Sequence, residues 1–153
     1  MTGFARRANE LERVMAYWLF KEEPTHYNFA DLERDGKAVW NGVDNNLARQ
    51  NLRKVRRGDR ILYYHTGKEK AIVVEMTALS DSRPDPANED DKAVVVEVRA
   101  EKRWKNPVTL TRIKGDPQLW GWELVRLPRL SVLPVTEAQW RRVEELSTEA
   151  EKS

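Results

Sequence analysis

Three short motifs of this chain place aromatic, amide and charged side chains where a strand is expected to end. They are Tyr17–Pro24 (YWLFKEEP), Val39–Val43 (VWNGV) and Ile61–His65 (ILYYH). Small β folds line pockets for planar ligands in this way, with aromatic side chains against the ligand faces and a few polar groups at its edge. The motifs therefore indicate a pocket for a flat heterocycle such as a nucleobase.

Trp40 is the residue that we expect to form a wall of this pocket. It stands between a predicted strand and a polar Asn-Gly turn, where an indole ring can stay partly open to a ligand. A base extruded from a duplex loses stacking worth a few kcal/mol. Stacking on one aromatic ring contributes roughly 1–3 kcal/mol per base. Stacking on one or two rings, together with several polar contacts, is therefore enough to offset this loss. The alternative is that Trp40 is simply a core residue.

The other aromatic residues are expected to be mainly structural. Trp18 and Phe20 alternate to the face of the first strand opposite Lys21, which favours packing in the core. Trp120 and Trp122 flank Gly121 and share one side if the segment is extended. They are either a rim of the pocket or, as we favour, packed residues.

Polar side chains near these aromatic residues are the candidates for reading the edge of a base. An amide both donates and accepts hydrogen bonds, which suits Asn41, Asn45 and Asn51, although asparagine is also the usual turn and cap residue. Glu23 can accept a hydrogen bond from an exocyclic amine, as carboxylates do with cytosine, or form a surface ion pair.

Cations gather at the end of the first strand and on one predicted helix. Lys21, Arg49, Arg53 and Lys54 form a local positive patch that would orient a phosphate backbone without specifying its sequence. The whole chain carries 27 basic and 25 acidic side chains, too even a balance for tight unspecific binding to nucleic acid, so a polyanion site has to be local. The alternative is a solvated helix face.

The sequence gives little support to metal or nucleophile chemistry. His65, beside Tyr64, either hydrogen bonds within the pocket or is a structural histidine. His26 is the only other histidine, and the pair has no zinc-ligand spacing. There is no cysteine, no Gly-x-Ser-x-Gly motif and no glycine-rich phosphate loop. We therefore expect no metal and no cofactor, and the tools of an enzyme would have to be Lys, Glu, Thr or Tyr.

Length and hydropathy indicate one globular domain. The 153 residues are enough to bury a core, and no stretch approaches the ~18 consecutive apolar residues of a membrane span. The lack of cysteine fits a reducing compartment, and a cytoplasmic location is expected. We expect an N-terminal arm over residues 1–14, a folded domain over 15–147 and a tail over 148–153.

The elements that position these residues follow from periodicity and capping residues. Strands are predicted over residues 16–21, 38–40, 60–65, 71–79, 93–103 and 130–133, with a loop over 80–91. Helices are predicted from a cap at Asn28 to Gly36, after Asn45 or Asn46 with an apolar stripe at Leu47, Ala48, Leu52 and Val55, over 109–115, and after Thr136. This order lacks regular strand–helix alternation. It predicts an α+β fold with a mixed, mainly antiparallel, partly closed β-barrel and flanking helices.

The same motifs resemble the EVE domain. The resemblance rests on Tyr17–Pro24, on Trp40–Leu52, on Gly58–Asp59–Arg60 leading to Tyr64–His65, and on Arg129–Val135, and it runs from about residue 15 to about residue 146. It implies a PUA-like β-barrel related to the YTH and ASCH domains. It also implies recognition of modified cytosine, such as 5-methylcytosine, in DNA, with RNA as a further possibility.

Several positions depart from the usual pattern of that family. Glu22 stands where serine is common, and Asp44 replaces a cation with an anion near the expected site. The segment 71–76 lacks the usual glycines, and Ala93 replaces an aromatic residue. These changes affect the expected ligand rather than the expected fold.

Three functions remain open from the sequence. The leading hypothesis is a non-catalytic reader that flips a modified base against Trp40, with Lys21, Glu23, Asn41, Asn45, Asn51, Tyr64 and His65 around it and with Arg49, Arg53 and Lys54 on the phosphates. The alternative is a small hydrolase similar to ASCH domains, acting on a modified nucleoside with Lys21, Glu23 and Thr25. The third is a small-molecule or peptide-binding adaptor that does not bind nucleic acid.

Overall fold

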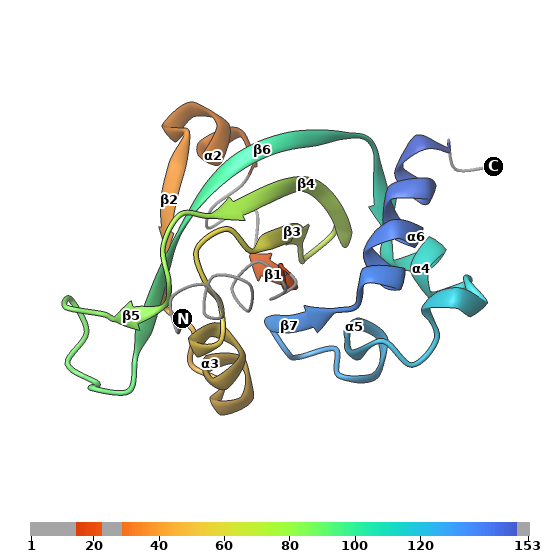
Figure 1. Cartoon of the computed structure of the whole chain (residues 1–153). Helices are drawn as coiled ribbons and strands as arrows, with labels where there is room; N and C mark the ends of the chain where they lie inside the picture. The colour runs from red at the N-terminus through yellow and green to blue at the C-terminus, as the bar shows by residue number, and fades with distance from the viewer. Residues whose placement is uncertain (1–14, 23–28, 150–153) are drawn as a thin grey trace, which may run out of the picture.

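A curved sheet organises the chain. The computed structural model describes residues 15–22 and 29–149, so the expected arm over residues 1–14 and the expected cap Asn28 lie outside the described residues. Six of the seven described strands follow the order β2-β6-β4-β3-β1-β7, and the seventh, β5, pairs with β6 beside this path (Figure 1). The strands are β1 (Tyr17–Glu22), β2 (Lys37–Trp40), β3 (Arg60–His65), β4 (Ala71–Ala78), β5 (Arg83–Pro84), β6 (Val94–Thr109) and β7 (Val132–Val135).

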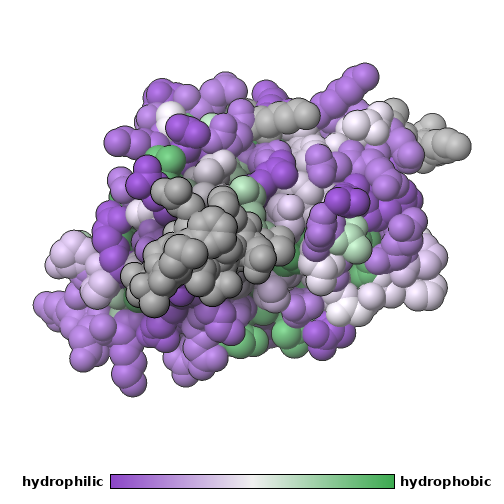
Figure 2. Space-filling view, in the orientation of Figure 1, coloured by the Kyte–Doolittle hydropathy of each residue, from purple (hydrophilic) through white to green (hydrophobic). Residues whose placement is uncertain are grey.

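The sheet is mixed and mainly antiparallel. β1 and β3 run parallel at its centre, and the other described pairs are antiparallel. Since β2 and β7 end the strand order without pairing with each other among the described residues, the barrel is only partly closed. The predicted α+β fold with a partly closed barrel is thus confirmed. Polar and charged side chains cover most of the face seen in Figure 2, and apolar side chains appear there only in small groups.

Helices flank the sheet on several sides. They are α2 (Phe29–Asp35), α3 (Asn46–Arg53), α4 (Leu110–Lys114), α5 (Glu123–Arg126) and α6 (Glu137–Thr148), with a 3-10 helix, η1 (Pro117–Leu119). In Figure 1, α4, α5 and α6 gather at one end of the molecule, whereas α2 lies beside β2. Helix α6 packs on β6, and α3 contacts both β6 and β7.

Helix α3 bridges the open side of the sheet. The Asn51 amide donates a hydrogen bond of 2.8 Å to the Val132 carbonyl of β7. Two residues further on, the Arg53 guanidinium donates one of 2.6 Å to the Lys92 carbonyl, just before β6. Side-chain bonds from one helix therefore connect β7 with the segment just before β6, although these two parts are far apart in the strand order.

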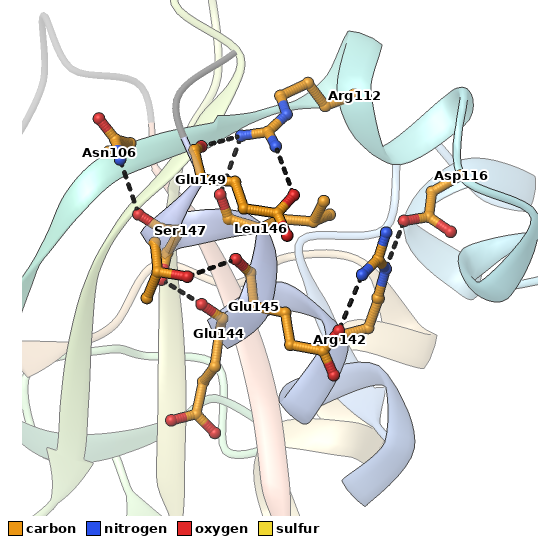
Figure 3. A network of polar contacts seen from close by, with 10 residues as sticks. Asn106, Arg112, Asp116, Arg142, Glu144, Glu145, Leu146, Ser147 and Glu149 are labelled. Carbon is orange, nitrogen blue, oxygen red and sulfur yellow. Dashed lines mark hydrogen bonds and ion pairs between the residues drawn. The ribbon is translucent and has the colours of Figure 1, made fainter. Parts of the chain in front are cut away.

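Two arginines fix the C-terminal helix (Figure 3). Arg112 of α4 donates hydrogen bonds to the carbonyls of Leu146 and Glu149, at 2.9 and 3.0 Å. The last carbonyls of a helix lack the usual partner one turn further on, so the guanidinium supplies a donor to the Glu149 carbonyl and a second one to the Leu146 carbonyl, which also accepts from the Glu149 N–H. Arg142 donates to the Asp116 carboxylate at 2.6 Å. Helix α6 is thereby connected to both α4 and the start of η1.

Caps and early strands were predicted well. Thr136 caps α6 and forms a capping box with Gln139. The helix predicted to end at Gly36 does so, and Gly36 takes a left-handed φ of 77°. Leu47, however, is wrongly placed in the apolar stripe of α3, because its side chain is 45% exposed. Asn51 takes a buried position on that helix instead.

Two strand predictions were wrong at prolines. β6 was expected to end at Arg103, but it continues to Thr109 through Pro107. The register with β4 shifts between Ile72 and Val74, so Pro107 falls where the ladder is interrupted and no N–H is needed. β7 was expected before Pro134 but includes it. β7 is an edge strand that pairs with β1, and an edge tolerates proline.

Candidate functional site

Strands β1 and β3 carry three of the predicted site residues, Lys21, Tyr64 and His65, at their carboxyl ends. Their register pairs Lys21 with Tyr64 and Glu22 with His65. Successive side chains of a strand point to opposite faces of the sheet. Lys21 and Tyr64 therefore share one face, the Lys21 face, whereas His65 lies on the other, the Trp40 face. The structure does not bring the predicted residues into one pocket, because it divides them between two faces.

The Trp40 face carries a row of aromatic rings. The centroid of the Trp40 ring lies 5.3 Å from that of Phe20 and 5.5 Å from that of Tyr63. Tyr63 in turn meets the His65 ring edge to face at 5.0 Å. We call these four residues the aromatic row. Edge-to-face and tilted pairs at such distances stabilise aromatic clusters beyond their buried area.

The expectation that the Trp40 ring stays partly open was wrong. Trp40 is only 6% exposed, because Phe20 and Tyr63 enclose it together with the surrounding core. A strand end beside an Asn-Gly turn does not keep a ring accessible when two neighbouring strands carry aromatic side chains toward it. Stacking of a base on Trp40 would require atoms that now cover the ring to move.

His65 is a buried polar member of the aromatic row. Its Nδ1 lies 2.6 Å from Glu69 Oε2, a carboxylate in the turn between β3 and β4. The imidazole is 5% exposed, so its orientation is fixed by this contact and by the Tyr63 ring. His65 thus has direct structural contacts with Glu69 and Tyr63, and a role in ligand binding stays a prediction.

The Lys21 face holds a cleft of about 250 Å³, which we call the lysine pocket. It is lined by Lys21, Tyr64, Thr66, Gly67, Lys70, Leu110, Lys114, Leu124 and Pro128. The Lys21 amine donates a hydrogen bond of 2.9 Å to the Pro128 carbonyl and lies 5.6 Å from the centre of the Tyr64 ring. This geometry suits a cation–π contact.

Burial changes the pKa of both central groups of this pocket. Desolvation lowers the pKa of the Lys21 amine from 10.5 to about 8, because a buried ammonium loses hydration. The same cause raises the pKa of the Tyr64 hydroxyl to about 12, since the neutral form is favoured there. Tyr64 therefore stays a neutral hydrogen-bonding group, whereas Lys21 titrates close to physiological pH.

The three predicted asparagines have different surroundings. Asn51 is buried and donates to Val132, so its amide connects α3 with β7. Asn45 caps α3 by accepting from the Ala48 N–H at 3.0 Å, and it lines a cleft with Leu47 and residues 126–130. Asn41 is exposed beside Gly42, whose φ of 73° forms the turn after β2. Asn41 and Asn45 are both exposed, whereas Asn51 is buried.

The predicted phosphate-binding cations of α3 are partly occupied by the protein itself. Arg49 donates to the Val43 carbonyl at 2.6 Å and to Asp90 at 2.8 Å. The Lys92 N–H and then Arg49 lower the pKa of the Asp90 carboxyl. Arg53 is bound to the Lys92 carbonyl, whereas Lys54 is exposed. Arg49 is thus held by contacts within the protein, Arg53 and Lys54 are exposed, and phosphate binding by these three cations stays a prediction.

Trp120 is a residue whose exposure the sequence did not reveal. Trp122, its neighbour across Gly121, is completely buried and donates to the Pro134 carbonyl. Trp120 is 67% exposed, and its Nε1 donates to the Lys114 carbonyl at 3.1 Å. Gly121, at φ 85°, turns the chain between them. An isolated tryptophan in a short loop gives no sequence signal that decides between these two outcomes.

Glu23 and Thr25, which were predicted as site residues, lie outside the described residues. Within residues 15–22 and 29–149, no group of three or more histidine, aspartate or glutamate side chains is placed to hold a metal ion. In the same ranges, no helix is both long and apolar enough to cross a membrane.

Comparisons with known proteins agree with this architecture. A protein from Rhodopseudomonas palustris, solved by NMR, is 36% identical with a TM-score of 0.83, and the match covers 90% of this chain and 97% of that one. The crystal structure of human THYN1 protein in complex with DNA containing 5-methylcytosine is 25% identical with a TM-score of 0.80, covering 89% and 99% of the two chains. An ASCH protein from Zymomonas mobilis, 11% identical with a TM-score of 0.55, shares the fold alone.

Sequence comparison leads to the same group of proteins. Thymocyte nuclear protein 1 of Homo sapiens is 26% identical over 166 residues, a match that covers 86% of this chain and 74% of that protein. That name refers to the nucleus, and a cytoplasmic location for the present chain stays a prediction. The family model described as "EVE domain" matches residues 16–146. The chain therefore belongs to the EVE domain family.

Proposed function

We propose that this protein is a non-catalytic reader of a modified nucleobase, with a modified cytosine in DNA as its ligand. The observation that carries the proposal is the similarity over nearly the whole fold to human THYN1 protein, whose structure was solved with DNA containing 5-methylcytosine. The aromatic row adds a physical reason, because flat ring faces at a strand end are what a base stacks on.

In the proposed mechanism the base leaves its stack and enters at the carboxyl ends of β1 and β3. Trp40 supplies a ring face, and His65 is the polar member of the same aromatic row, whereas Asn41 follows Trp40 directly in the chain. Because Trp40 is 6% exposed, binding has to uncover the ring. The cost of this rearrangement lowers the affinity for every base. Discrimination between bases then depends on contacts that only the modified base makes.

The test is a titration with matched oligonucleotides that contain cytosine or 5-methylcytosine at one position. Tighter binding of the methylated oligonucleotide is expected, with a loss of this preference in Trp40→Phe. Trp104→Phe is the control, because Trp104 is also buried but pairs with Trp140 of α6. Equal affinities for both oligonucleotides, unchanged in Trp40→Phe, would refute the proposal.

One observation favours hydrolysis as a second candidate function. An amine with a pKa of about 8 in a cleft can act as a general base, and Lys21 has this property. The likeness to the ASCH protein supports this candidate through the fold alone. Incubation with acylated nucleosides, followed by chromatography, tests it. Absence of product over long incubation excludes the hydrolase.

A further inference from the structure

The lysine pocket concentrates positive charge from three separate elements. Lys21 comes from β1, Lys70 from the turn before β4, and Lys114 from the end of α4. None of the residues that line the pocket in the described chain is an aspartate or glutamate. The ammonium groups therefore have no carboxylate among the lining residues to neutralise them. Such a cleft attracts an anion, and low-dielectric walls strengthen the attraction.

The size of the pocket limits which anion it takes. Its volume of about 250 Å³ is below the roughly 300–1,000 Å³ of sites that enclose a whole small-molecule ligand. The hydroxyls of Tyr64 and Thr66 line it and can donate to oxygen. A phosphate group fits these features, with the rest of its molecule continuing outside the cleft.

Trp120 provides an independent reason to expect a polymer rather than a free phosphate. Its indole is bound to the Lys114 carbonyl, so an exposed aromatic surface is held next to a pocket lysine. The loop that carries it is fixed by a second bond of 2.7 Å, from Arg126 Nε to the Gly121 carbonyl. An exposed ring in a fixed position loses little conformational entropy when a base stacks on it.

We propose that the lysine pocket and Trp120 together bind the strand of a nucleic acid, with a phosphodiester in the pocket and a neighbouring base on the indole. This inference rests on the proposed function and adds to it the path of the backbone. Lys21 and Glu22 are adjacent in β1, as Tyr64 and His65 are in β3, so the pocket lies at the same sheet end as the aromatic row. A strand whose base enters on the Trp40 face therefore passes close to the Lys21 face.

The test combines salt titration with a charge-removing variant, Lys70→Gln/Lys114→Gln, both residues being exposed. Dissociation constants are measured at several salt concentrations for a cytosine and a 5-methylcytosine oligonucleotide. Each phosphate contact contributes about 0.7–0.9 to the slope of log affinity against log salt. The variant is expected to reduce this slope by about 1 and to weaken both oligonucleotides by the same factor, which leaves their affinity ratio unchanged.

Trp120→Ala tests whether a base stacks on the exposed indole. It is expected to weaken binding by about 5- to 150-fold, equivalent to about 1–3 kcal/mol, with no change in the salt slope. Lys37→Gln is the control for the lysine variant, because Lys37 is an exposed lysine at the start of β2 and outside the pocket. It removes one positive charge, where the double variant removes two, and it removes no pocket contact.

The outcomes separate this inference from the proposed function. A smaller salt slope in the pocket variant, with the slope of Lys37→Gln unchanged, supports binding of the nucleic acid backbone in the lysine pocket. This conclusion holds even if methylated and unmethylated oligonucleotides bind equally. Identical slopes and affinities in the pocket variant and in Lys37→Gln overturn it, whatever the base preference. NMR titration with inorganic phosphate adds a further arm. Phosphate-induced shifts at Gly67 and Lys114, without any effect of the variants on oligonucleotide binding, would assign the pocket to free phosphate and overturn the strand proposal.

Discussion

The two faces of strands β1 and β3 differ in their accessibility, although neighbouring residues of the same strands form them. On the Trp40 face, Phe20, Trp40 and Tyr63 are almost completely buried, and their rings contact one another. On the Lys21 face, the same strand ends open into a cleft with amines and hydroxyls. One face is filled by packing, whereas the other is left accessible and charged.

Sequence neighbours in these strands therefore belong to different environments. Residues adjacent in a strand lie on opposite faces, so a motif such as Tyr64–His65 contributes to two environments. In this protein the face with more aromatic residues is the less accessible one. Burial, and not residue type, decides which aromatic side chain can meet a ligand without rearrangement.

The largest loss of stability is expected when Trp40 is removed from the aromatic row. Trp40→Ala removes a buried indole that touches two rings, and it should lower the free energy of unfolding by about 3–5 kcal/mol. Urea denaturation monitored by circular dichroism measures this change. A loss below about 1 kcal/mol would show that the ring is not part of the core. It would also contradict the difference in burial between the two faces.

A smaller effect is expected at the end of the same row. His65→Ala removes the contact with Glu69 and the edge-to-face contact with Tyr63, so a loss of about 1–3 kcal/mol in unfolding free energy is expected. Thermal denaturation of this variant and of Lys70→Ala compares a buried with an exposed residue of the same strand end. Equal melting temperatures for the two variants would contradict this ranking.

The charge of Lys21 should make the affinity for an oligonucleotide depend on pH. Below about pH 8 the Lys21 amine is protonated, and above it the charge is lost, so oligonucleotide affinity should fall by up to about tenfold between pH 7 and pH 9. Tyr64, with a pKa of about 12, stays neutral in this range, and Lys70 and Lys114 are the other charged groups that line the pocket. A bound phosphate favours the protonated amine, so the fall begins near the pKa of the free protein, about 8, and continues up to the raised pKa of the complex.

Lys21→Arg is the matched variant for this measurement. Arginine keeps its charge throughout the range, so its affinity should change little between pH 7 and pH 9. Fluorescence anisotropy at constant ionic strength measures both proteins. The same decline in both proteins would mean that another group controls the pH dependence.

The smallest effect on stability is expected at Trp120. Its side chain is 67% exposed, so Trp120→Ala should change the unfolding free energy by no more than about 0.5 kcal/mol. Trp122→Ala, which removes a completely buried ring, is the paired control and should cost about 3–5 kcal/mol. Similar losses at both positions would show that Trp120 has a structural role and weaken its assignment as a binding surface.

Much of the fold was predictable because its signals are local. The Thr136 cap, the Gly36 turn and the run of strands from Arg60 to Ala78 depend on residues close together in the chain. The misplaced ends of β6 and β7 depend on pairing partners far away, which decide whether Pro107 and Pro134 interrupt a ladder. Proline alone does not reveal whether its position lies at an edge or at a bulge.

The candidate site was less predictable for the same reason. Its residue types were recognised, but Asn51 and Arg53 bind backbone carbonyls of distant segments, and this pairing is invisible in the sequence. The lysine pocket joins Lys21 to Lys70 and Lys114, which no motif connects. Three-dimensional proximity therefore supplied the part of the site that residue type could not.

The bridge made by α3 also covers part of an edge strand. An edge strand with free carbonyls can template pairing with a second chain, which is a route to aggregation. The Asn51 amide occupies the Val132 carbonyl on the open side of β7, and the helix itself stands in front of that edge. Detachment of this one helix would expose a ready-made template for cross-β assembly.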